Sequence, residues 1–167
     1  MYLLSLIKQM KWTNFIFPGL LVWFLQLVTI DFFSINNVRP DFIVLLVLYW
    51  AIKHGRFTGV LSGTFIGFVV DLTGTAIFFG LSPLMYSVTG YLSGNLNGTY
   101  NKLNPFYFSL LWISILFLQF LVFCVVQYQD LWILDKQLFF GKWVGTSLYT
   151  LSFAGIIQFI YPLYREY

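Results

Sequence analysis

Apolar residues extend along almost the whole chain, from Phe15 to Tyr161, in six runs separated by short polar or basic segments. Apolar residues make up 59 % of the 167 positions and charged residues only 9 %, whereas a soluble domain carries about 25 % charged residues. A chain of this kind is expected to lie in a bilayer. We therefore expect residues 1–167 to form a single transmembrane domain without a separate soluble part.

An all-α bundle of about six transmembrane helices is predicted from these runs, with approximate bounds 15–30, 40–52, 57–72, 81–96, 106–128 and 143–161. A comfortable span takes about 20 apolar residues. The second to fourth runs are shorter, so they either cross with little tilt, thin the bilayer locally or include re-entrant pieces. The first run is interpreted as a retained span rather than a signal peptide, because no small-residue cleavage site follows it.

Basic residues in alternate loops predict the orientation, because short cytoplasmic loops are enriched in lysine and arginine. One side would hold Lys8, Lys11, Lys53, Arg56, Lys102 and Arg165, and the other only Arg39, Lys136 and Lys142. Both termini are therefore expected in the cytoplasm. The segment 130–142 is too polar to span and is expected along the outer interface. It either caps the ends of two spans or offers a docking surface to an external partner.

Two glycine stripes at four-residue spacing lie within the third and fourth runs: Gly59, Gly63 and Gly67, and Gly90, Gly94 and Gly98. Small residues let two helix backbones approach closely in a membrane. If the two spans pack antiparallel, Gly67 is expected opposite Gly90, Gly63 opposite Gly94 and Gly59 opposite Gly98. Self-dimerisation through either stripe is the alternative. A different face of the third span, Leu61, Phe65, Phe68 and Leu72, is expected to meet lipid.

Asp71 continues the first stripe and is placed by this pattern in the outer half of the bilayer. An aspartate at the centre of a membrane helix costs about 2.5 to 3.5 kcal/mol on insertion scales, so it is expected to face protein or water. Three roles are open. It could cap the turn after its helix by accepting hydrogen bonds from Thr73, Thr75 or nearby amides. It could line a cavity or contact a partner, or it could exchange a proton.

No enzyme, cofactor or metal site is expected. The single cysteine, Cys124, lies in an apolar run without a nearby base, and His54 stands alone beside Lys53 in a basic turn. An aspartyl protease would need a second carboxylate within reach of Asp71, and the other acids are predicted in loops. The net charge of +3 is common for membrane proteins with basic cytoplasmic loops, so nucleic-acid binding is not expected.

The order "RPDFIVLLVLYWAI", "KHGR", "GVLSGTFIGFVVDLTG" and "FFGLSPLMYSVTGYLSG" resembles the bacterial rod shape-determining protein MreD family. The likeness in motif detail covers about residues 38 to 98. The likeness in length and hydropathy covers the whole chain. Its most specific elements are the pair Pro40 and Asp41, the glycine helix that ends in Asp71, Gly80 with the following leucine, and Gly90 with the following Tyr-Leu.

This resemblance implies a multispanning scaffold of the bacterial inner membrane in the cell-elongation and peptidoglycan-synthesis machinery. The implied partners are MreC and, through it, MreB, RodA and a class B penicillin-binding protein. The implied fold is similar to that of the substrate-binding subunits of energy-coupling-factor transporters. A small-solute-binding transporter subunit is therefore the alternative function, although the spans offer few polar groups beyond Asp71 for such a site.

Overall fold

The computed structural model describes residues 19–24, 26, 38–73, 78–100 and 102–160, and the elements that these residues form are helices. They are α3 (Phe42–His54), α4 (Arg56–Leu72), α5 (Leu81–Gly94), α6 (Pro105–Gln127), α7 (Gln129–Leu134) and α8 (Lys136–Ile160), preceded by a helical segment at 19–24. The all-α prediction is thus confirmed for this part of the chain. Most of the predicted first span, 15–30, lies outside the described residues.

Local sequence signals explain where several helices begin. The Asp41 side chain caps α3 by accepting a 3.0 Å hydrogen bond from the amide of Val44. Gly55 is the single residue between α3 and α4, and its φ of +89° permits the sharp reversal of the chain. Asn104 caps α6, which has proline at its first position. Side-chain caps and one glycine therefore define where these helices begin.

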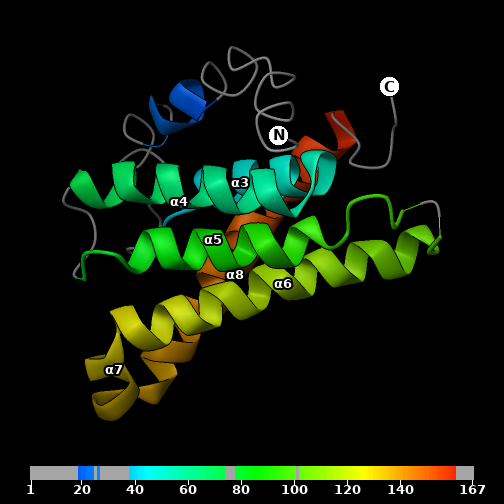
Figure 1. Cartoon of the computed structure of the whole chain (residues 1–167). Coiled ribbons are helices and arrows are strands. Elements are labelled where there is room, and N and C mark those ends of the chain that lie inside the picture. The colour runs from blue at the N-terminus through cyan, green and yellow to red at the C-terminus, as the bar shows by residue number, and fades with distance from the viewer. Residues whose placement is uncertain (1–18, 25, 27–37, 74–77, 101, 161–167) are drawn as a thin grey trace.

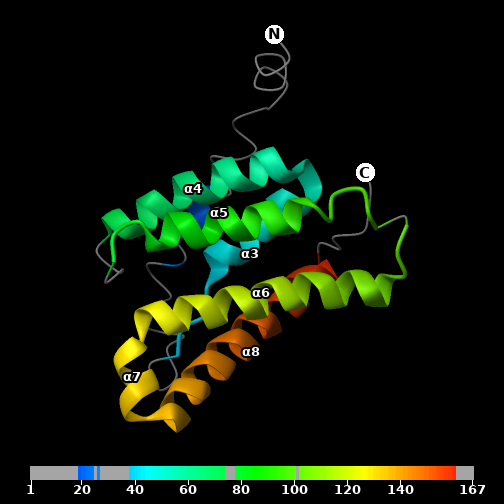
Figure 2. The ribbon, with the colours of Figure 1, turned by 60° about the horizontal axis from the view of Figure 1, so that its bottom comes forward.

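Helices α3, α4 and α5 pack into one tight unit, and α6 continues the layer beside α5 (Figure 1). α8 runs obliquely past α6 and also touches α3, while α7 joins α6 to α8 at one end (Figure 2). Most buried apolar side chains come from α3 and α6, among them Val44, Val47, Phe108 and Leu116. The core therefore lies between the α3–α5 unit and the α6–α8 pair.

The helix ends gather at two opposite ends of the molecule (Figure 1). One end holds the α3–α4 reversal, the connection 95–104 and the end of α8. The other holds the starts of α3, α5 and α8 with α7. Helix starts and helix ends thus alternate between the two ends of the molecule, as expected if successive helices cross the same layer in opposite directions.

Among the described helices, α6 is the one that is long and apolar enough to cross a membrane by length and composition, and α3 is a shorter apolar helix. α4 has 17 residues and α5 has 14. The six-span bundle therefore stays a prediction.

One predicted boundary is wrong. The segment 130–142 was expected to be a single interfacial stretch before a span starting at residue 143, but it contains α7 and the first turns of α8. α8 begins at Lys136 because the Asp135 side chain accepts a 3.1 Å hydrogen bond from the amide of Leu138, which is an N-terminal cap. Seven residues of the expected loop therefore belong to a helix of 25 residues.

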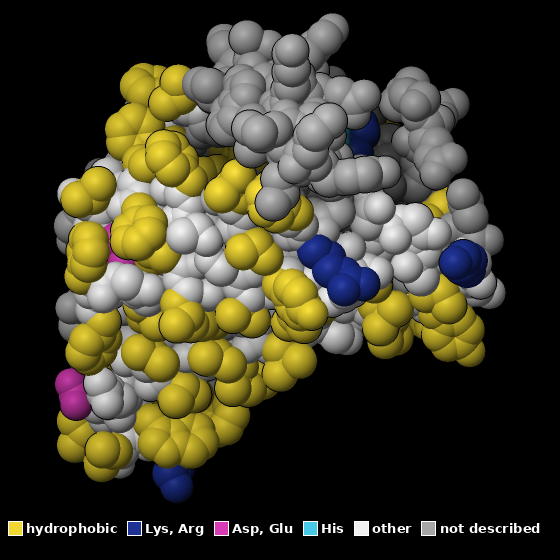
Figure 3. All heavy atoms as spheres, in the orientation of Figure 1, with side chains coloured by type: hydrophobic (Ala, Val, Ile, Leu, Met, Phe, Trp, Pro, Cys, Tyr) yellow, Lys and Arg dark blue, Asp and Glu magenta, His cyan; other side chains and the backbone are white. Residues whose placement is uncertain are grey.

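Large apolar side chains are exposed along α4, α5, α6 and α8, and hydrophobic atoms cover much of the visible face (Figure 3). The predicted lipid-facing set on α4 is exposed: Leu61, Phe65, Phe68 and Leu72. Exposed hydroxyls bond within their own helix, as Ser114 does to the carbonyl of Leu110 and Ser152 to that of Leu148. Such internal bonds suit a lipid-facing surface, because a hydroxyl that is bonded within its helix does not need water.

Candidate functional site: the glycine seam and the two carboxylates

α4 and α5 touch backbone to backbone along a line that we call the glycine seam: Gly59, Gly63 and Gly67 on α4, and Gly90 and Gly94 on α5. A methyl carbon placed on Gly63 would lie 2.5 Å from the carbonyl oxygen of Tyr86, and one on Gly59 would lie 2.5 Å from that of Gly90. Non-bonded carbon and oxygen atoms do not approach this closely. Any larger residue at these positions would therefore push the helices apart.

The register of the seam differs from the predicted one. Gly90 lies opposite Gly59, not Gly67. Gly63 lies opposite Tyr86, where Gly94 was expected. Gly67 faces Ser82 and Pro83, and Gly94 faces Gly55 and Arg56 at the start of α4. The antiparallel contact was expected, but the helices are displaced by about two turns.

Gly98 was also placed wrongly. It follows α5 in a turn with a φ of +68°, and no atom lies within 4 Å of the position that its Cβ would occupy. α5 ends at Gly94, so the helical spacing that would have carried Gly98 onto the seam stops one turn earlier. Gly98 serves the conformation of the turn instead.

Asp71 explains the register. Its Oδ2 accepts a 2.6 Å hydrogen bond from the amide of Gly80, which precedes α5 with a φ of +97°. This bond holds the start of α5 level with the last turn of α4. The predicted register came from matching the glycine positions alone and included no contact between these two helix ends. Drawing Gly80 back to Asp71 shifts every α5 glycine along α4.

The capping role considered for Asp71 involves a different donor from those expected. The Thr73 hydroxyl donates to the carbonyl of Val70, and residues 74–77, which include Thr75, lie outside the described residues. Asp71 is 5 % exposed, and its second oxygen, Oδ1, is buried without a hydrogen-bond partner. In this structure the carboxylate faces the protein interior and joins two helix ends.

A second polar contact crosses the seam halfway along it. The hydroxyl oxygens of Thr64 and Ser87 lie 2.7 Å apart, and each hydroxyl also lies within hydrogen-bond distance of a carbonyl of its own helix. Neither side chain was assigned a role from sequence beyond being a scattered polar group. Their pairing depends on the observed register, so helical spacing alone could not reveal it.

Pro40 and Asp41 lie where four parts of the chain meet. Asp41 Oδ2 accepts a 2.9 Å hydrogen bond from the hydroxyl of Tyr86 on α5, and the Asp41 amide donates to Thr150 on α8. Gln26 donates to the Pro40 carbonyl at 3.1 Å and accepts from the Phe42 amide at 3.0 Å. The sequence singled out Pro40 and Asp41 by resemblance but gave no signal for Tyr86 or Thr150.

Further polar side chains on the described helices also form structural links. Thr89 on α5 donates to Gln119 on α6 at 2.8 Å in a fully buried contact. The Trp143 indole on α8 donates to the carbonyl of Phe117 on α6 at 3.2 Å. Within the described ranges, no cluster of three or more His, Cys, Asp or Glu residues could hold a metal ion. The polar groups of this region thus connect helices to one another.

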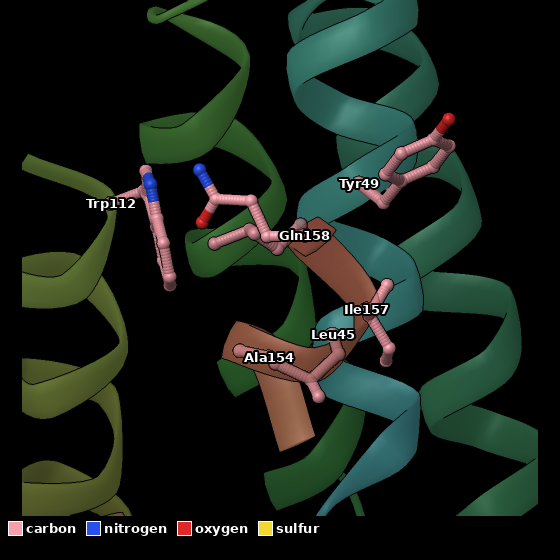
Figure 4. A pocket seen from close by; sticks show the side chains of 7 residues that line it. Leu45, Tyr49, Trp112, Ala154, Ile157 and Gln158 are labelled. Atoms are coloured by element: carbon pink, nitrogen blue, oxygen red, sulfur yellow. The ribbon is translucent and has the colours of Figure 1, made fainter. Parts of the chain in front are cut away.

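A small cavity of about 20 Å³ lies between α3, α6 and α8 (Figure 4). Its lining is mostly apolar: Leu45, Leu48, Tyr49, Trp112, Ala154, Ile157 and Gln158. Pockets that bind small organic ligands usually measure about 300 to 1,000 Å³. The cavity is therefore far smaller than a typical solute site.

The comparison with protein families decides the relationship that the motifs suggested. The family model described as rod shape-determining protein MreD matches residues 7–167. The chain belongs to the MreD family. Its role is accordingly in rod-shape determination, and the apolar helices agree with a membrane protein. No curated protein and no solved structure matches this MreD-family chain, so the fold likeness to energy-coupling-factor transporter subunits stays a prediction.

Proposed function

We propose that this MreD-family protein is a non-enzymatic scaffold of the cell-elongation machinery in the bacterial inner membrane. It would span the membrane several times with both termini in the cytoplasm. Its direct partner would be MreC, and MreB, RodA and a class B penicillin-binding protein would be reached through that complex. The family membership supports the general role. The particular partners are part of the proposal.

The observation that carries the scaffold role is the glycine seam. Backbone contact at Gly59, Gly63 and Gly67 leaves α4 and α5 little freedom to separate. A rigid pair of helices can hold partners at fixed positions. A solute-binding subunit would need a roomy pocket between its helices, and the small cavity described above favours the scaffold.

We assign partner contact to the outer face of α4, where side chains that were expected to meet lipid would pack against a partner helix instead. Phe65 is 73 % exposed and Leu72 is 75 % exposed, and Phe68 packs against Phe79 with ring centroids 6.3 Å apart. In a membrane, helices associate by close packing and dispersion rather than by loss of water. Large side chains fixed on the rigid α3–α5 unit suit such packing against a partner helix.

The test is copurification of MreC with tagged protein from gently solubilised membranes. Phe65→Ala should reduce the recovered MreC at unchanged membrane abundance, because it removes a large contact from the proposed surface. Leu148→Ala on α8 is the matched control, since Leu148 is also exposed, at 57 %. Equal recovery from both variants and the unsubstituted protein would contradict the assigned surface. A copurifying small solute detected by native mass spectrometry would favour the transporter alternative.

A further inference from the structure

α7 and the first turns of α8 form a projection at one end of the molecule, residues 128–142, that we call the elbow. In both ribbon views α7 turns sideways from the end of α6 and points away from the α3–α5 unit (Figures 1 and 2). None of the six residues of α7 is buried. Ile133 and Leu134, the tip of the elbow, are 77 % and 81 % exposed, and hydrophobic side chains gather over this region in Figure 3. An exposed apolar patch of this kind marks a contact with a partner or a membrane.

The shape of the elbow is held by its own aromatic side chains. Trp132 packs edge-to-face against Phe139 with ring centroids 5.0 Å apart, and Phe139 is buried. Trp143 continues the aromatic cluster onto α6, where its ring centroid lies 4.8 Å from that of Phe117. Edge-to-face and tilted ring contacts are the favoured geometries of aromatic pairs. The tip is therefore held outward by a packed aromatic base.

Helix length places the elbow at one edge of a bilayer. α6 has 23 residues, so it is roughly 34 Å long at 1.5 Å per residue. The hydrocarbon core of a bilayer is about 30 Å thick. If α6 crosses the core, its far end reaches the edge, and α7, which begins at Gln129, lies at that edge. This placement rests on the proposal that the protein spans the membrane and is independent of the proposed partners.

The polar groups of the elbow suit that depth. Lys136 Nζ lies 5.9 Å from the ring centroid of Trp132, and Lys142 Nζ lies 5.2 Å from that of Tyr128. Tryptophan and tyrosine are enriched at membrane–water interfaces. Lysine side chains there lay their apolar stems along apolar surface and extend the ammonium group to the headgroups. Two ammonium groups thus stand beside two rings of the interfacial type.

We propose that the elbow binds the phospholipid surface of the membrane. The tip enters the edge of the hydrocarbon, and Lys136 and Lys142 bind headgroup phosphates. A lipid surface offers hydrocarbon and anionic phosphate side by side, so one occupant fits both the apolar tip and the lysines. Of the two acids in the elbow, Asp135 is engaged as the cap of α8 and Asp130 is exposed in the first turn of α7. Because α7 joins α6 to α8, this contact would fix the height at which both helices cross the membrane.

The first experiment is electron paramagnetic resonance on the full chain in liposomes of phosphatidylethanolamine and phosphatidylglycerol. A nitroxide label is placed on single cysteines in a background without Cys124. Oxygen concentrates in hydrocarbon, whereas a nickel chelate stays in water. Labels in Ile133→Cys and Leu134→Cys should collide more with oxygen than with the chelate. Gln137→Cys, at an exposed polar position of the elbow, is the matched control and should favour the chelate.

Leu118→Cys on α6, where Leu118 is 59 % exposed, is the hydrocarbon reference. Hydrocarbon at Leu118 with water at the tip would overturn the elbow contact, leave the membrane placement standing and favour an external protein partner. Water at both would overturn the membrane placement together with the elbow contact. A tip shielded from both agents would mean that protein covers it, and would also overturn the proposal.

The second experiment tests the phosphate contact by solid-state NMR in the same liposomes. Dephasing of lysine ¹⁵Nζ signals by lipid ³¹P detects only nuclei within a few ångströms of each other. Lys136→Gln combined with Lys142→Gln should remove part of the dephased lysine signal. Gln137→Ala, a change in the same turn without loss of charge, should leave it unchanged. An undiminished dephased signal in the double lysine variant would overturn the binding of phosphate by these lysines.

Discussion

The Asp71 carboxylate accepts a 2.6 Å hydrogen bond from the backbone amide of Gly80, nine residues further along the chain. One contact thus joins the last turn of α4 to the residue that begins α5. Gly80 can take this place because its φ of +97° is readily available to glycine. The register of the glycine seam follows from this connection.

Substitution of Asp71 should distinguish a structural acceptor from a charged group. Asp71→Asn keeps an oxygen for the Gly80 amide and should largely preserve membrane abundance and rod shape. Asp71→Leu leaves that amide without its partner, which costs about 1 to 3 kcal/mol, and should impair both. Cell width and protein abundance would be measured in cells lacking the native copy. Failure of Asp71→Asn at normal abundance would show that the negative charge or a proton is required.

Helix α4 should tolerate large residues on its exposed face but not along the glycine seam. Gly63→Leu should abolish or strongly reduce the folded protein, because its side chain would meet the backbone of Tyr86. Leu61→Phe should be tolerated, since Leu61 is 45 % exposed. The measurement is membrane abundance and the thermal unfolding midpoint in detergent. A stable Gly63→Leu protein would refute the backbone contact.

The observed register can be tested by disulfide formation in a background without Cys124. Cysteines at Thr64 and Ser87 should crosslink within one chain, because the two hydroxyl oxygens lie 2.7 Å apart. Cysteines at Thr64 and Ser93, which the register expected from sequence would bring level, should not. The products are read by gel mobility before and after reduction. Crosslinking of the second pair, or a product of twice the chain mass, would support that register or a dimer.

The bond between Asp41 and Tyr86 should contribute measurably to the attachment of α3 to α5. Tyr86→Phe removes only the hydroxyl and should lower stability by about 1 kcal/mol, the usual size of a hydrogen bond between membrane helices. Unfolding of Tyr86→Phe, Asp41→Ala and the double variant would be compared, because alanine removes the acceptor of the Tyr86 hydroxyl. If the two hydrogen-bonding groups interact, the double variant should lose less than the sum of the single losses. Strict additivity would argue against the contact.

The proposed orientation predicts different labelling at the two ends of the molecule. A cysteine replacing Lys102 should react with a membrane-impermeant reagent only after the cells are opened, because that loop is expected in the cytoplasm. A cysteine replacing Asp130 should react in intact cells. Both would be scored in the Cys124-free background. Labelling of position 102 in intact cells would reverse the topology.

The sequence by itself determined the helical class, the antiparallel contact of two glycine helices and the outward face of α4. These features depend on local quantities: apolar content, helical spacing and the size of the side chain at each position. The fragment around Pro40 and Asp41 was also visible as a motif. Gly98 shows the limit of such reasoning, because spacing extends a stripe beyond the point where the helix ends.

Tertiary structure alone decided which residues meet. The displacement of Gly90 from Gly67 to Gly59 follows from the Asp71–Gly80 bond, which depends on how the chain turns between the helices. Likewise, Tyr86 reaches Asp41 across 45 positions of sequence. Helical periodicity fixes the face on which a residue lies, but not its height relative to a neighbouring helix. That height is set by turn geometry and by hydrogen bonds between distant residues, which a one-dimensional pattern does not contain.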